Sequence, residues 1–160
     1  MTMPDARPSS AAAGGLPLWA IIGAAGVITG VTVGLRQVVG LYMPPLTQSL
    51  GTGVGPFSTA MAVANLVWGV AGVVAGGLAD RYGAGRITAA GIALLMLGYY
   101  VMFAAQSGDD LLWSGIAIGT GVGAAGLSVL VGVVGRAAPP EKRTVAIATL
   151  GMASGIGNFV

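Results

Sequence analysis

Long apolar stretches alternate with short polar ones along most of the chain. After the first 16 residues they form five segments, at residues 17–43, 57–78, 87–106, 111–135 and 144–160. The first four reach the ~20 residues that carry an α-helix across a ~30 Å hydrocarbon core. The alternation of a barrel strand is absent, and a lone segment in lipid can satisfy its backbone only as a helix. The pattern predicts an all-α integral membrane protein with about five transmembrane helices.

The two ends of the chain differ from these segments. Residues 1–16 are rich in Pro, Ser, Ala and Gly, and we expect a flexible cytoplasmic tail. A signal peptide is disfavoured, because the apolar run that follows exceeds the roughly 7–15 residues of a signal-peptide core. The segment 144–160 stops without a flanking charge. We interpret it as a helix that is cut short, so that residues 17–160 form a partial bundle of a longer protein.

Composition excludes several other classes of protein. Charged residues make up 8% of the chain, against about 25% in soluble domains. Cys and His are absent, and all five acidic residues lie in the tail or in loops. Without a nucleophile and base, or paired carboxylates, inside the bilayer we expect no enzyme activity, no cofactor and no metal. The seven cations do not cluster on one helical face, so nucleic acid is not an expected partner.

The cations are distributed unevenly between the loops. The tail and the loops 79–86 and 136–143 hold six of the seven: Arg7, Arg81, Arg86, Arg136, Lys142 and Arg143. The loops 44–56 and 107–110 hold none. Because positively charged loops stay in the cytoplasm, we expect a cytoplasmic N-terminus and a location in a bacterial-type inner (plasma) membrane.

Polar side chains within the apolar segments are the candidate binding residues, since each is costly in lipid. Thr29, Thr32, Arg36 and Gln37 follow helical spacing on one face of the first segment. Asn65 lies in the second segment. We expect these five residues to bind a small-molecule substrate, with the Arg36 guanidinium donating two hydrogen bonds to a carboxylate. The open alternative is that Arg36 extends to the outer interface.

The loop between the second and third segments carries a motif. It reads Gly76-Gly77-Leu78-Ala79-Asp80-Arg81-Tyr82-Gly83-Ala84-Gly85-Arg86. This resembles the signature G-x-L-a-D-R-x-G-r-r of the major facilitator superfamily, which lies between its helices two and three. Ala84 departs from the usual basic pair, and a cation returns only at Arg86. The resemblance implies a gate that holds the two halves of a transporter together on the cytoplasmic side. Its residues would be Gly76, Asp80, Arg81, Gly83 and Arg86.

A second stretch, from Arg136 to Asn158, is similar to the superfamily's connection from helix four into helix five. The resemblance implies the N-terminal six-helix half of a twelve-helix fold, truncated within helix five. Its partners would be membrane lipid and the missing C-terminal half. Residues 34–42 resemble the first helix of monocarboxylate and oxalate/formate-type transporters. Those monocarboxylate carriers generally have Lys where Arg36 stands, which argues against proton coupling at this residue.

Other transport classes fit the sequence less well. Drug/proton antiporters usually carry an Arg in helix four and a Gly-Pro pair in helix five, but residues 111–135 hold no cation and Ile156 follows Gly155. Small multidrug exporters need a Glu in helix one, and no acid lies there. We expect a secondary active transporter that moves an organic anion such as a monocarboxylate by alternating access, with or without a coupled proton. A drug or metabolite/proton antiporter and a non-transporting membrane assembly protein stay open.

Overall fold

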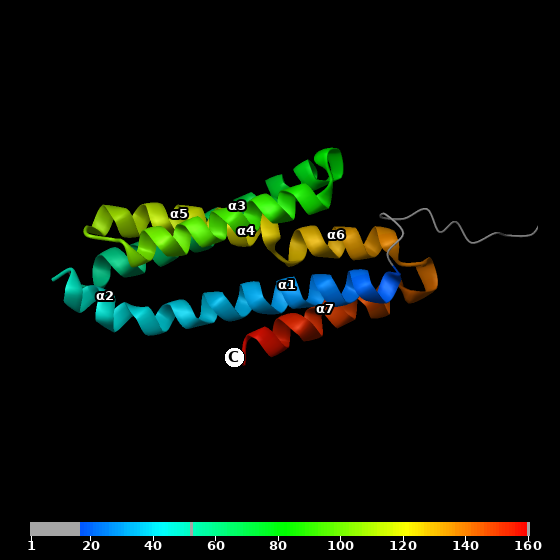
Figure 1. Cartoon of the computed structure of the whole chain (residues 1–160), viewed down its shortest axis with the longest axis horizontal. Coiled ribbons are helices and arrows are strands. Elements are labelled where there is room, and N and C mark those ends of the chain that lie inside the picture. Colours follow the sequence, from blue (N-terminus) through cyan, green and yellow to red (C-terminus); the bar gives the residue numbers. More distant parts are fainter. Residues whose placement is uncertain (1–16, 52, 160) are drawn as a thin grey trace, which may run out of the picture.

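A computed structural model describes residues 17–51 and 53–159. The elongated bundle that these residues form is helical throughout (Figure 1). Its elements are α1 Leu18–Val38, η1 Val39–Tyr42, α2 Met43–Ser49, α3 Val54–Tyr82, α4 Ala84–Phe103, α5 Gly108–Ala125, α6 Leu127–Ala137, η2 Pro140–Lys142 and α7 Arg143–Gly157. The tail expected at residues 1–16 lies outside the described residues.

The predicted all-α membrane fold is confirmed. Four helical stretches are long and apolar enough to cross a membrane, judged by length and composition: Leu18–Ser49, Val54–Tyr82, Ala84–Phe103 and Gly108–Ala137. Large apolar side chains such as Val73 and Phe103 are 79% and 88% exposed. Such surfaces suit contact with lipid tails rather than water.

The helical structure extends beyond the predicted ends of the segments. Residues 44–56 were expected to form a loop, but η1 and α2 continue the first span as far as Ser49. Pro44 lies in the first turn of α2, where the missing N–H would have no helical partner in any case. The fourth span begins at Gly108, three residues before the prediction. There the Ser107 hydroxyl and the Asp110 carboxylate each accept a hydrogen bond from the other's backbone N–H, which stabilises the helix start.

The fourth span is interrupted, whereas the sequence predicted one helix over residues 111–135. Gly126 adopts an extended backbone (φ −81°, ψ −178°) between α5 and α6. A Cβ atom at this position would press on the carbonyl oxygen of Val122. Glycine therefore allows the break, and the chain resumes as a helix at Leu127.

The break separates two groups of helices. In Figure 1, α3, α4 and α5 lie above one part of α1, and α6 lies above another part of it, to their right. The α3–α4–α5 bundle has a core of Val39, Phe57, Ala60, Leu95, Met102, Leu111, Ile118 and Val122. The α1–α6–α7 bundle has a core of Ala25, Leu130, Val134, Ala138, Ala146 and Leu150. Since α5 and α6 are consecutive, Gly126 is a covalent junction between the two bundles.

Candidate functional site

Arg36 lies in the last turn of α1 and contacts α3. Its Nη2 donates a hydrogen bond to Oδ1 of Asn65. Its guanidinium carbon lies 4.5 Å from the centroid of the Trp68 ring, a cation–π geometry. A side chain that extended to the outer interface would run along α1. This one reaches across to a neighbouring helix.

Both polar atoms of the Asn65 side-chain amide form hydrogen bonds. Its Nδ2 donates to the carbonyl oxygen of Met61 at 2.9 Å, while its Oδ1 accepts from Arg36. Trp68 follows three residues later, on the same face of α3. The two side chains together orient the guanidinium and leave some of its five N–H donors free of these contacts.

Tyr99 on α4 carries a second notable polar group. The Tyr99 ring packs against the core of the α3–α4–α5 bundle. Its hydroxyl is buried and has no hydrogen-bond partner among the described residues. Buried polar groups are nearly always paired, so this hydroxyl is an exception among the described side chains.

The structure does not bring the other three predicted residues into this cluster. Thr29 and Thr32 are only 1% and 4% exposed, so they face other helices rather than an open pathway. The Thr29 hydroxyl donates to the carbonyl oxygen of Ala25 at 2.8 Å, which satisfies it within α1. Gln37 is exposed. Thr29 and Thr32 are both buried, as their shared helical face predicts. Helical spacing does not reveal whether such a face packs against other helices or lines a pathway.

The predicted gate loop contains an ion pair. Oδ1 of Asp80, near the end of α3, accepts from Nη1 of Arg136 on α6. The loop turns at Gly83, whose φ of +93° strongly favours glycine. Arg81 and Arg86 are exposed. A Cβ atom on Gly76 would meet nothing within 4 Å, so close packing does not explain that glycine.

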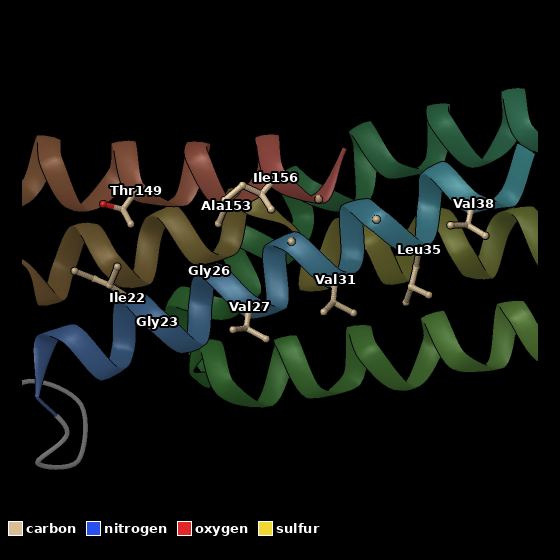
Figure 2. Close-up of a pocket in the computed structure, with 13 residues that line it drawn as sticks. Ile22, Gly23, Gly26, Val27, Val31, Leu35, Val38, Thr149, Ala153 and Ile156 are labelled. Atoms are coloured by element: carbon tan, nitrogen blue, oxygen red, sulfur yellow. The ribbon is translucent and has the colours of Figure 1, made fainter. Parts of the chain in front are cut away.

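A separate apolar groove lies between α1 and α7 (Figure 2). It has a volume of about 640 Å³. Figure 2 shows the side chains of Val27, Val31 and Leu35 projecting from α1, with Ile156 on α7 nearby. Neither Arg36 nor Asn65 lines it. The groove and the polar cluster are therefore distinct features of the first span.

Comparison with known protein families decides the class. A sequence model of the Major Facilitator Superfamily matches residues 9–160. The chain belongs to the Major Facilitator Superfamily. No curated protein and no solved structure gives a significant match. Members of this superfamily are secondary transporters that bind small-molecule substrates, which agrees with the four apolar spans of an integral membrane protein.

Two residues that contact predicted positions, Trp68 and Arg136, were missed in the sequence. Tyr99, whose buried hydroxyl is unpaired among the described residues, was not singled out either. Trp68 could have been found, because it stands three residues after Asn65 in the second span. Arg136 was visible as a cation at the end of the fourth span. Tyr99 had no signal, because it lies in a segment already rich in bulky apolar and aromatic residues.

Proposed function

We propose that the protein acts in a secondary transporter for a small organic anion, such as a monocarboxylate, and that Arg36 binds the carboxylate. The observation that carries this is the set of contacts made by Arg36. Among the described residues the one ion pair joins Asp80 and Arg136. Arg36 instead contacts a neutral amide and an indole. A cation at membrane depth is costly, and an anionic ligand would supply the missing countercharge.

The form of the cluster supports a carboxylate in particular. The planar guanidinium can donate two parallel hydrogen bonds to one carboxylate, which a compact ammonium group cannot. Asn65 and Trp68 hold the guanidinium before a ligand arrives, so less side-chain entropy is lost on binding. The remaining candidates Thr29, Thr32 and Gln37 are not needed for this geometry.

Replacement of Arg36 tests the proposal. Uptake of radiolabelled monocarboxylates is measured in cells that express the protein from its complete coding sequence, at matched amounts in the membrane. We expect Arg36→Gln to lower uptake by roughly 10- to 100-fold, because a hydrogen bond to a charged group is lost. Arg36→Lys should lose less. Lys142→Gln, which removes an exposed charge far from the cluster, serves as the control. Unchanged uptake by Arg36→Gln would refute carboxylate binding at this residue.

We further propose a cytoplasmic N-terminus in a bacterial-type inner membrane, from the distribution of cations. The chain has no cysteine, so single cysteines can be placed freely. Asp109→Cys should react with an impermeant maleimide in intact cells. Gly85→Cys, in the first turn of α4, should react only after the membrane is opened. The reverse pattern would invert the orientation.

A further inference from the structure

We propose that Trp68 couples the anion site at Arg36 to the break in the fourth span, so that a bound anion changes the angle between α5 and α6. The proposal rests on the proposed function and deepens it, because it names the side chain through which ligand binding reaches the backbone. The Trp68 indole contacts both features. Its ring lies over the Arg36 guanidinium, and its Nε1 lies 3.8 Å from the position that a Cβ atom on Gly126 would take.

The place of this ring in the fold is the first support. The guanidinium carbon of Arg36 lies 4.5 Å from the ring centroid and meets the face of the ring. Gly126 lies near Nε1, at the edge of the same ring. Arg36 comes from α1, Trp68 from α3, and Gly126 joins α5 to α6. Because an indole is rigid, a displacement of the ring at the guanidinium also moves the edge that meets the break.

The packing of α3 around the break is the second support. A Cβ atom on Gly123, in the last turn of α5, would lie 2.7 Å from the Cβ atom of Ala71. A Cβ atom on Gly72 would lie 3.2 Å from Oγ of Ser128, in the first turn of α6. Helix α3 therefore contacts the chain on both sides of the break, one turn after Trp68. A change of angle at the break alters the contact with α6 and can leave the contact with α5 in place.

The chemistry of Arg36 supplies a reason for the ring to move. Without a ligand, a cation–π attraction holds the guanidinium against Trp68. A carboxylate that accepts two hydrogen bonds from the guanidinium forms a charge-assisted pair, and it offsets the positive charge that attracts the ring. The anion thus favours an arrangement in which the ring is released. A ligand shifts a conformational equilibrium only through such a difference in its affinity for the two states.

A distance across the break measures the coupling. Trp113→Cys on α5 and Val145→Cys on α7 carry spin labels, since both positions are 67% exposed and α7 shares a core with α6. The protein is expressed from its complete coding sequence and reconstituted in lipid vesicles. Lactate, a small monocarboxylate, is the probe. We expect saturating lactate to shift the label distance by about 2 Å or more, and we expect Arg36→Gln to abolish the shift.

Trp68→Phe separates the two contacts of the indole. Phenylalanine keeps an aromatic face for Arg36 but lacks the Nε1 edge that lies near Gly126. The Kd for radiolabelled lactate should rise by no more than about threefold, because tryptophan is the better cation–π partner. The label shift should be lost even at saturating lactate. The control is Trp19→Phe, since Trp19 is 76% exposed at the start of α1, and it should keep both properties.

Gly126→Ala approaches the coupling from the other side. Its methyl group would press on the carbonyl oxygen of Val122, and Gly126 makes no contact with the guanidinium. Because coupling between two sites is reciprocal, a change at the break must change the affinity for lactate, by about fivefold or more. In the background of Trp68→Phe the same substitution should leave Kd unchanged. Gly132→Ala, within α6, should leave it unchanged in both backgrounds.

The outcomes distinguish this proposal from the proposed function. If the label distance does not respond to lactate, or if it responds fully in Trp68→Phe, the coupling proposal fails and carboxylate binding at Arg36 stands. An unchanged Kd in Gly126→Ala would also overturn the coupling, and this measurement does not depend on the folding of Trp68→Phe. Normal binding and uptake by Arg36→Gln would instead refute the proposed function.

Discussion

The pairs α3–α5 and α1–α7 are both packed through glycines four residues apart, but they differ in how many of these positions bring the two backbones close together. A Cβ atom on Gly119 of α5 would lie 3.1 Å from both the Cα and the carbonyl carbon of Ala64. A Cβ atom on Gly30 of α1 would meet only the carbonyl oxygen of Ala153, at 3.3 Å. A Cβ atom would press on the backbone of α3 at Gly115, Gly119 and Gly123. In the second pair it would do so only at Gly157, against Gly30, and this pair borders the groove of about 640 Å³ (Figure 2).

The same four-residue spacing therefore accompanies different packing in the two pairs, so small residues determine where helices can meet. The rest of the bundle determines how closely they do so, and α4 packs against α5 through Gly91 and Gly98.

The strongest test of this difference is alanine substitution at Gly119 and at Gly30. Gly119→Ala forces a methyl group against the backbone of Ala64, which cannot rotate away, and should lower the free energy of unfolding by about 2–3 kcal/mol. Gly30→Ala needs only a small shift of one carbonyl group, and alanine favours the helix by up to about 1 kcal/mol. Its net effect should be below about 1 kcal/mol. Unfolding in mixed micelles, followed by circular dichroism, measures both. Equal losses at the two sites would contradict the comparison.

The junction between the bundles gives a second, smaller effect. Gly126→Ala places a methyl group where the Val122 carbonyl oxygen lies, and alanine favours a continuous helix by about 1 kcal/mol. We expect the fourth span to straighten and unfolding free energy to fall by about 1–2 kcal/mol as α6 shifts against α1 and α7. Spin labels at Trp113 and Val145, both exposed, should report a changed distance. Gly132→Ala, within α6 and with room for a methyl group, is the control. An unchanged label distance would show that the break does not depend on glycine.

Much of the fold could be predicted from the sequence, because lipid allows an apolar segment few alternatives to a helix. The break at Gly126 could not, since glycines in membrane helices usually serve packing, as Gly119 does. Arg36 and Asn65 stood out as polar residues in apolar runs, and their role in binding stays a prediction. The buried hydroxyl of Tyr99 could not be predicted, because an aromatic residue that faces lipid and one that packs inward look alike in sequence. Which face of α1 is open depends on α6 and α7, and helical spacing does not reveal that.

The smallest expected effect on stability concerns the ion pair that joins the two bundles through side chains. Asp80 on α3 and Arg136 on α6 have side chains that are 61% and 52% exposed, so the pair should contribute less than about 1 kcal/mol. A weak contact can still affect transport, because shifting a conformational equilibrium needs only a small differential energy. We expect Asp80→Asn to leave unfolding almost unchanged, to lower uptake severalfold, and not to add to Arg136→Gln.

Exchange of the two charges sharpens this last prediction. In the double variant Asp80→Arg with Arg136→Asp the attraction is restored in reverse, so uptake should recover part of what either single reversal loses. Asp109→Asn, an exposed acid at the opposite end of the bundle, should change neither quantity. If the double variant shows no higher uptake than the single variants, the attraction between Asp80 and Arg136 does not determine the rate of uptake. Asp80 would then act through other residues of its loop, and the two bundles would be coupled through Gly126 and their packing alone.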